Sequence, residues 1–321
     1  MEQITINDDI QFMIKQLSAK FSQGNSEMKV TENIFEYQGY RTIPPFSKEA
    51  TEYVHKEWET PENSVIVSSF PKTGTVWCTE VVRQIVYSKN ANLYDLVKSL
   101  PMPFFVLEMG NRQKFEVLKK LPIPRQVYTT HLAEGIFNHE RVKKSNSKVI
   151  YVMRNPKDQA VSWFHFAKKI PIPDSLKKEM GEDWNEFFSK YVNGEHLNCT
   201  KEGRFYPDNL REWMKHKDDD NFLVVVYEDM KRDFAGQIRR IAKFLEVELD
   251  DIDVERISDA CSIGSMKKRA ETEETGILKM NVRKGTVGGW KDQFTVAQSE
   301  IMDKIIEERL AGTGIKFDYT L

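Results

Sequence analysis

Residues 64–77 read Ser-Val-Ile-Val-Ser-Ser-Phe-Pro-Lys-Thr-Gly-Thr-Val-Trp and carry the strongest signal in the chain. The apolar run 65–67 predicts a buried strand, and residues 76–87 predict a helix. Between them, Lys72-Thr73-Gly74-Thr75 supplies a cation, two hydroxyls and a glycine. A strand, a tight basic turn and a helix N-terminus in this order bind phosphate, because backbone N–H groups and the positive end of the helix dipole face the anion. We therefore predict an anion site at this turn.

Further strand and helix units follow along the chain. Three more buried strands are predicted, at 126–130, 148–153 and 222–227. Asn155-Pro156 predicts the start of a helix, and residues 234–245 have apolar side chains at helical spacing. Apolar strands that alternate with amphipathic helices indicate an α/β fold with a central parallel sheet and helices on both faces. Ligands of such sheets bind beyond the carboxyl ends of the strands, which is where Lys72, His131 and Arg154 fall.

The composition is that of an ordinary globular protein. The chain has 321 residues, 40% of them apolar and 30% charged, which predicts a single domain over 1–321 with residues 1–30 as an N-terminal extension. The formal net charge of −2 gives no reason to expect a nucleic-acid or membrane partner. An anion site must therefore depend on a local concentration of Lys and Arg.

The cysteines and the N-terminus bear on the compartment. Cys78, Cys199 and Cys261 are odd in number and widely spaced, so we expect neither a disulfide framework nor a zinc site from them, and no metal site is expected elsewhere. The first nine residues are acidic and lack an apolar segment, and no run of about 18 apolar residues exists. A cytoplasmic protein is expected.

The phosphate loop differs from the common nucleotide-binding motif G-x-x-x-x-G-K-[ST], which is absent. Pro71, Lys72, Thr73, Gly74, Thr75 and Trp77 instead resemble the P-K-[ST]-G-[TN]-[TS]-W loop of the cytosolic sulfotransferases. The resemblance implies a fold like that of the P-loop nucleotide kinases and the donor 3′-phosphoadenosine 5′-phosphosulfate. It also implies that the 5′-phosphosulfate is bound by Lys72, Thr73, Gly74, Thr75, Val76 and Trp77. Val76 replaces a hydroxyl residue of the family, which removes one side-chain contact.

Two other segments resemble the family's 3′-phosphate site. Residues 148–162 match V-x-Y-V-x-R-N-x-K-D-x-x-V-S, and residues 283–291 match R-K-G-x-x-G-x-W-K. The resemblance implies that the 3′-phosphate is bound by Arg154, Ser162, Arg283, Lys284 and Gly285. The planar fork of an arginine suits such a phosphate.

The adenine site rests on residues that also suit a core. Tyr227 opens a Y-E-D-M segment whose tyrosine contacts the adenine in the family, and Trp77 is implied to stack on the same base. Both aromatic side chains fit a hydrophobic core equally well. The family's Thr and Phe near the adenine correspond to Cys261 and Ile263, which leaves one ring fewer.

The candidate base is His131. Residues 124–132 resemble P-R-x-x-K-T-H-L with one residue inserted, and a histidine with a pKa near ~6.5 suits a general base at neutral pH. By resemblance, His131 accepts the acceptor's proton and Lys72 stabilises the leaving oxygen. Thr129 stands where the family has a lysine. The charge of the transferred group must then be stabilised by Lys72 or by another cation.

Weaker sequence patterns predict the acceptor pocket and the oligomeric state. Candidates for an aromatic acceptor pocket, which core packing explains as well, are Phe46, Phe104, Phe105, Phe164 and Phe166. Residues 291–300 fit the family's dimer segment K-x-x-x-T-V-x-x-x-E, through Lys291, Thr295, Val296 and Glu300. Thr295 and Gln298 also form a helix capping box, and the two interpretations are compatible.

Together these patterns predict sulfonyl transfer to a hydroxyl, or less readily an amine, of a small apolar acceptor. An ATP-dependent kinase of related fold is an alternative, but it needs a lysine directly after the glycine and an acidic residue for Mg²⁺, and neither is found. A nucleotide-binding protein without activity is a second alternative. It is indicated by Thr129, which stands where the family has a lysine. Residues 168–184 and 263–289 are predicted to be irregular binding loops.

Overall fold

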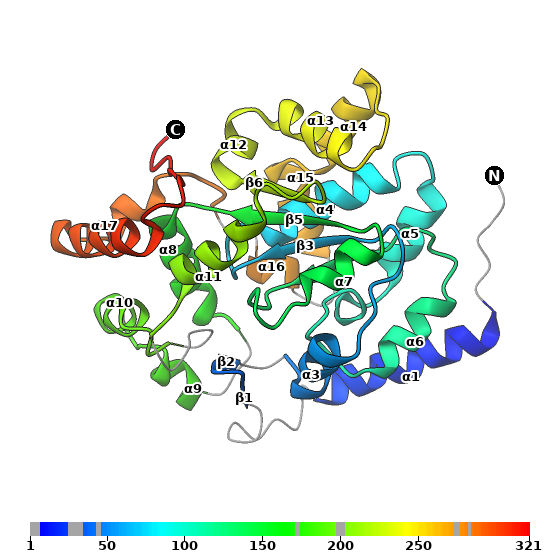
Figure 1. The fold of residues 1–321 in the computed structure, drawn as a ribbon, viewed down its shortest axis with the longest axis horizontal. Helices are drawn as coiled ribbons and strands as arrows, with labels where there is room; N and C mark the ends of the chain where they lie inside the picture. The colour runs from blue at the N-terminus through cyan, green and yellow to red at the C-terminus, as the bar shows by residue number, and fades with distance from the viewer. Residues whose placement is uncertain are drawn as a thin grey trace.

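The computed structural model describes residues 7–24, 35–42, 46–170, 174–196, 203–272, 277–281 and 284–321. Its centre is a four-stranded parallel sheet with the strand order β4-β3-β5-β6. The strands are β4 Val127–Thr130, β3 Val65–Ser69, β5 Lys148–Met153 and β6 Phe222–Val226. Helices cover both faces of the sheet (Figure 1). The predicted fold class is confirmed.

The strands form where apolar residues run without interruption. All five residues of β3 are buried, because helices pack on both sides of this central strand. β3 pairs in parallel with β4 and with β5, so that Ser68 lies opposite Thr130 and Ser69 opposite Val152. This register places the ends of three strands at one edge of the sheet.

A helix follows three of the four strands at the predicted places. α4 Thr75–Val86 comes after β3, α8 Pro156–Ala167 after β5, and α12 Tyr227–Arg232 and α13 Phe234–Phe244 after β6. α8 begins as its sequence predicts, since the Asn155 side chain accepts a hydrogen bond of 2.8 Å from the Asp158 N–H.

The other elements surround this unit. They are α1 Asp8–Gly24, α3 Lys48–Lys56, α5 Ala91–Ser99, α6 Gln113–Lys120, α7 His139–Lys144, α9 Asp174–Glu179, α10 Trp184–Val192, α11 Tyr206–Trp213, α14 Asp251–Ala260, α15 Ile263–Thr272, α16 Ile277–Asn281 and α17 Val296–Leu310. Three short 3-10 helices are η1 Met102–Phe104, η2 Met214–His216 and η3 Gly289–Asp292, and a small hairpin joins β1 Phe35–Tyr37 to β2 Tyr40–Thr42. Of the described residues, none form a helix that is long and apolar enough to cross a membrane.

The two segments predicted to be irregular contain helices, which corrects that prediction. α9 lies in the first, and α15 and α16 lie in the second. In α15, Met266 and Ala270 are one helical turn apart and both are buried, so a short apolar stripe fixes the helix despite its charged surroundings.

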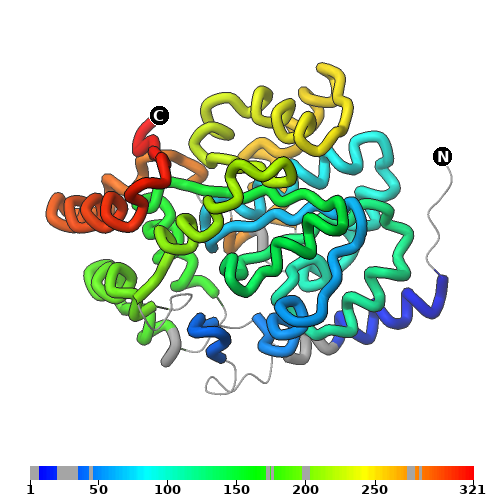
Figure 2. Tube along the Cα trace, viewed as in Figure 1, coloured from blue at the N-terminus to red at the C-terminus, as the bar shows by residue number. Residues whose placement is uncertain are grey.

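α1 and the C-terminal residues lie on opposite sides of the molecule (Figure 2). Residues 8–24 of the expected N-terminal extension form α1, in which Ile10 and Leu17 are buried. At the other end α17 packs beside α8, where the Lys157 Nζ lies 2.7 Å from Ser299 Oγ and 2.7 Å from the Asp303 carboxylate. The predicted capping box of Thr295 and Gln298 opens α17.

Candidate active site

The phosphate loop turns sharply between β3 and α4. Lys72 and Gly74 have φ angles of +72° and +109°, and Gly74 is the N-cap of α4. A Cβ atom at Gly74 would lie 2.7 Å from the ring of Tyr227, so this position requires glycine for its conformation and for its packing. The first N–H groups of α4 have no partner within the helix, and the loop directs them toward the end of the sheet.

The side chains of the loop have distinct surroundings. Thr73 Oγ1 donates to the Phe70 carbonyl at 2.9 Å, and Thr75 Oγ1 lies 2.6 Å from Ser69 Oγ. The Lys72 Nζ donates to Asn281 Oδ1 of α16 at 2.8 Å and lies 4.2 Å from the centre of the Phe166 ring. The lysine therefore spans the space between α16 and α8.

His131 lies beside the end of β3. Its Nδ1 is 2.9 Å from the Ser69 carbonyl oxygen and 3.3 Å from Ser69 Oγ. A carbonyl oxygen only accepts hydrogen bonds, so we assign the ring proton to Nδ1. In the neutral ring, Nε2 then carries the lone pair.

The pKa of His131 is lowered from its usual value. Burial is the main cause, because it penalises the charged ring, and the positive charge of Lys72 adds to it. The carboxylate of Glu108 and the hydrogen bond to Ser69 oppose the shift. The net direction leaves the ring neutral at pH 7, which is the form that accepts a proton.

Glu108 is the functional residue that the sequence analysis missed. Its carboxylate accepts from the His131 N–H at 2.6 Å and from Thr130 Oγ1 at 2.9 Å. It reaches them because residues 105–109 run alongside β4, with Leu107 N–H donating to the Thr129 carbonyl at 3.0 Å. No motif marks Glu108, since its role depends on this long-range contact.

Lys114 holds the same segment from the opposite side. Its Nζ is fully buried and lies within hydrogen-bonding distance of the carbonyls of Pro103, Val106, Leu107 and Met109, and burial lowers its pKa to about 7. Ordinary surface patterning would place a lysine of α6 in solvent. Here it satisfies the backbone of an irregular segment and so fixes the position of Glu108.

Arg154 lies at the predicted second anion position. It is buried, its Nη2 donates to the Thr286 carbonyl at 3.0 Å, and its guanidinium lies 4.3 Å from the centre of the Tyr227 ring. Within the described part of the chain, its buried Nε has no hydrogen-bond partner. A buried donor of this kind fits an anionic ligand.

The other residues predicted for this anion are placed less directly. Ser162 is half-buried on α8, and Lys284 is exposed with its Nζ 3.4 Å from Asp292. Gly285 has a φ angle of +67° and packs so closely on Ile263 that a Cβ would lie 2.2 Å from Ile263 Cδ1. Arg283 lies outside the described residues.

Asp158 anchors the C-terminal loop and was also missed. Its carboxylate accepts from the N–H groups of Gly288 at 2.8 Å and Trp290 at 2.9 Å. The loop therefore lies against α8 and brings Thr286 to Arg154. An aspartate in the first turn of a helix normally indicates only dipole compensation.

The aromatic residues predicted for an adenine lie together. The Trp77 Nε1 donates to the Cys261 carbonyl at 2.9 Å, and the Trp77 and Tyr227 rings are 5.4 Å apart at an angle of 72°. The hydrogen bond from Trp77 is accepted by the backbone of Cys261, so it does not depend on which side chain stands at position 261. Its thiol and that of Cys78 are buried, and burial raises the pKa of Cys78 to about 12.

Thr129, at the position of the missing lysine, faces α4. Its side chain is buried and its Oγ1 lies 3.2 Å from Thr79 Oγ1, one helical turn beyond Thr75. A neutral hydroxyl pair thus occupies the space next to the phosphate loop.

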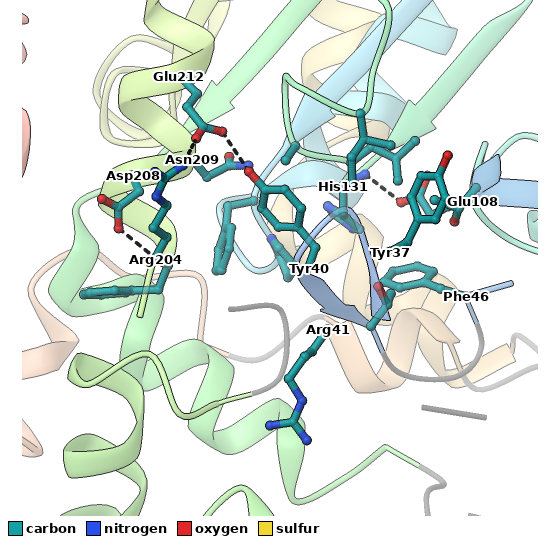
Figure 3. Close-up of a pocket in the computed structure, with 18 residues that line it drawn as sticks. Tyr37, Tyr40, Arg41, Phe46, Glu108, His131, Arg204, Asp208, Asn209 and Glu212 are labelled. Carbon is teal, nitrogen blue, oxygen red and sulfur yellow. Dashed lines mark hydrogen bonds and ion pairs between the residues drawn. The ribbon is translucent and has the colours of Figure 1, made fainter. Parts of the chain in front are cut away.

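A cavity opens next to His131 (Figure 3). One side carries His131, Glu108, Tyr37 and Phe46, and the other carries α11, where Glu212 accepts from Tyr40 at 3.1 Å and from Arg204 at 3.4 Å. The residues that line it are Tyr37, Tyr40, Arg41, Thr42, Phe46, Thr51, Phe70, Pro71, Glu108, His131, Leu132, Ala133, Ile136, Arg204, Phe205, Asp208, Asn209 and Glu212. The side at His131 therefore combines aromatic rings with the Glu108 carboxylate, and the side at α11 carries Arg204, Asp208 and Glu212.

Only one of the five predicted pocket phenylalanines, Phe46, lines this cavity. Phe104 and Phe105 are fully buried, and Phe164 packs against Trp184 and Phe187 at 5.4 Å and 5.2 Å. Phe164 also lines a second cavity together with Ala167 and Lys168, and the role of all five phenylalanines in an acceptor pocket stays a prediction. Phe166 lies under Lys72.

Comparison with known proteins agrees with this geometry. The family model of the sulfotransferase domain matches residues 62–314. The chain belongs to the sulfotransferase family. It is 30% identical to mouse sulfotransferase 6B1 over 291 residues (91% of this chain and 90% of that protein). It is 32% identical to a rabbit amine sulfotransferase over 276 residues (83% and 86%). The crystal structure of mouse sulfotransferase SULT7A1 complexed with PAP matches with a TM-score of 0.72 and 28% identity, covering 88% of this chain and 95% of that one.

The environment of His131 can be tested without any ligand. We expect an NMR titration to give a His131 pKa below about 6.5, because burial disfavours the charged ring. Glu108→Gln keeps the size of the side chain but removes a negative charge, so the pKa should fall further. Glu116→Gln, at an exposed position of α6, is the matched control and should leave the titration unchanged. A His131 pKa that rises in Glu108→Gln would contradict this account.

Proposed function

We propose that this sulfotransferase transfers a sulfonyl group from 3′-phosphoadenosine 5′-phosphosulfate to a hydroxyl, or less readily an amine, of a small acceptor. The observation that carries the proposal is the hydrogen bond from His131 Nδ1 to the Ser69 carbonyl at 2.9 Å. It leaves Nε2 as the basic atom of a ring that lines the cavity. An acceptor hydroxyl in this cavity would give its proton to Nε2 as its oxygen attacks.

Residues of this chain fit the donor. The loop 72–77 would hold the 5′-phosphosulfate, and Gly74, without a Cβ, lets the backbone approach it. The 3′-phosphate would be bound by Arg154, whose buried Nε lacks a partner among the described residues, with Ser162, Arg283 and Lys284. Gly285 would let the loop approach the same phosphate, and Trp77, Tyr227, Cys261 and Ile263 would enclose the adenine. When bound, this donor supplies the sulfonyl group and its 3′,5′-bisphosphate is the leaving group.

Lys72 would place its positive charge where negative charge develops on the leaving oxygen. It lies on the loop itself and is held at 2.8 Å from Asn281. A fixed cation in a site that excludes water stabilises such a charge better than a mobile one. The burial of Thr129 against Thr79 supports the view that Lys72 carries more of this task here.

The acceptor would enter from the charged end of the cavity. The apolar surface near His131 comes from Phe46, Phe70 and Ile136, which suits a small apolar group. Glu212 and Arg204 at the opposite end suit a second, polar group on the acceptor. We also propose a cytoplasmic location and a homodimer through Lys291, Thr295, Val296 and Glu300, which rest on the family resemblance. All four of these side chains are exposed. Lys291 and Thr295 precede α17, and Val296 and Glu300 lie near its N-terminus.

A nucleotide-binding protein without activity remains the second candidate, because Thr129 is a buried neutral side chain where the family has a lysine. Detection of any sulfonated product separates the two. Incubation with labelled donor and a panel of phenols, alcohols, sterols and amines makes that measurement.

We expect His131→Ala to lose about 10²–10⁴-fold in kcat and to keep its affinity for the nucleotide, because the ring acts on the acceptor. His131→Asn is the matched control, since its amide N–H can still donate to the Ser69 carbonyl but it has no basic nitrogen. Both variants should be equally impaired in steady-state assays. An Asn variant with near-normal kcat would show that the ring has only a structural role.

We expect 3′-phosphoadenosine 5′-phosphate to bind far more tightly than AMP, because Arg154 would contact the extra phosphate. Arg154→Gln should reduce that preference by about 10- to 100-fold, the loss expected for one buried charge-assisted hydrogen bond. Arg239→Gln changes an exposed arginine that pairs with the exposed Asp251, and it should have no effect. Calorimetric titration gives both affinities. Equal affinities for the two nucleotides in wild type would exclude the proposed site.

We expect Val296→Glu to yield monomers that still turn over. Val296 is 77% exposed, so the substitution leaves the fold intact and places two charges against each other in a two-fold contact. Sedimentation at micromolar concentration measures the state of association. A wild type that sediments as a monomer would refute the dimer.

A further inference from the structure

Three side chains that carry metal ligands meet away from the active site. His139 begins α7, while His216 ends η2 and Asp219 lies in the turn that follows it. One ligand atom from each lies within 4.8 Å of the other two. The ring of His139 also contacts Phe222, the first residue of β6, so the cluster lies near the start of that strand. The phosphate loop and Arg154 follow the opposite ends of their strands.

The distances suit a tetrahedral ion. The His139 Nε2 is 3.3 Å from Asp219 Oδ2, and the His216 Nδ1 is 3.1 Å from the same oxygen. Ligands bonded to Zn²⁺ at about 2.0–2.1 Å in tetrahedral geometry lie about 3.3 Å apart. The third pair, one nitrogen from each histidine, lies within 4.8 Å, and the two rings lie 4.0 Å apart at 36°, so both rings must turn to surround one centre.

His139 is a buried polar group without a satisfied hydrogen bond. It is only 4% exposed, and in the described part of the chain neither ring nitrogen has a hydrogen-bond partner of acceptable geometry. A bound metal ion would satisfy one of these buried ring nitrogens.

Glu134 orients the second histidine. Its Oε1 lies 2.9 Å from His216 Nε2, on the side of the ring away from Asp219. If Nε2 donates to this carboxylate, Nδ1 carries the lone pair and faces Asp219. Metal-binding histidines typically donate their other N–H to a carboxylate in this way.

We propose that His139 Nε2, His216 Nδ1 and an Asp219 oxygen form a site for a zinc ion, with Glu134 as the positioning residue. Two imidazoles and one carboxylate are a donor set that zinc accepts, with water as the fourth ligand. The ion would join α7, η2 and the turn before β6. No sequence motif marks the site, because 76 residues separate the two histidines along the chain.

Lys143 competes for the same carboxylate. Its Nζ lies 2.9 Å from Asp219 Oδ2 and 3.5 Å from Glu140. Zinc must displace the ammonium group from Asp219, so the lysine weakens binding. Lys143→Met should therefore bind zinc more tightly than wild type, a change that a purely structural ion pair would not produce.

The experiment measures zinc binding by full-length protein from which any affinity tag has been removed, after treatment with a chelator. Calorimetry should give one zinc ion per chain. Asp219→Asn and His216→Asn should each lose at least about 10–100-fold in affinity, and Glu134→Gln should lose a similar factor. Asp218→Asn, which removes the same charge from the exposed neighbour, is the matched control and should bind as wild type does.

Two results would overturn the proposal: a wild type that binds no zinc, or an Asp219→Asn variant that binds it equally well. In either case the cluster is a network of polar contacts of His216 with Glu134 and Asp219 that holds no metal ion. Melting curves without metal show that each variant is folded. Co²⁺ in place of zinc should give the visible absorption of a tetrahedral site in wild type and not in Asp219→Asn. None of these readouts requires sulfonyl transfer.

Discussion

The parallel pairing of β3 with β4 and β5 is the constraint on which the active site depends. Because Ser68 lies opposite Thr130, the next residues, Ser69 and His131, leave the sheet side by side. The hydrogen bond from the His131 ring to the Ser69 carbonyl follows directly from that register. A shift of one residue would turn the side chains of β4 to the opposite face and separate the base from the phosphate loop.

Buried charges fix the loops around this edge. Glu108 holds the start of the segment after β4, Asp158 holds the loop at 288–290, and Lys114 satisfies the carbonyls at 103–109. Each of these groups bonds mainly to backbone atoms of an irregular segment. A buried charge without partners is costly, so these loops have few alternative conformations that keep the charges satisfied.

The sequence predicts an element correctly where its pattern lies within a short stretch of the chain. The strands have continuous apolar runs, the helix at 156 has its Asn-Pro start, and the phosphate loop has its glycine, so these elements lie where they were predicted. The roles of Glu108 and Asp158 could not be predicted, because their partners are distant in sequence and only the folded chain brings them together. The roles of Phe104 and Phe105 stay predictions, since a buried aromatic side chain has the same sequence pattern in a core as in a pocket. The helices at 263–272 and 277–281 have too short an apolar stripe to be distinguished from a loop by periodicity.

The two buried cysteines have a consequence for measuring motion in this molecule. Cys78 lies in α4, directly behind the phosphate loop, and the Cys261 carbonyl receives the Trp77 indole. Only a thiolate reacts readily with alkylating reagents, and burial keeps both groups protonated and shielded. Their rate of chemical labelling is therefore set by how often this helix and its neighbour open. The described part of the chain thus carries two natural reporters of local unfolding at the nucleotide side of the sheet.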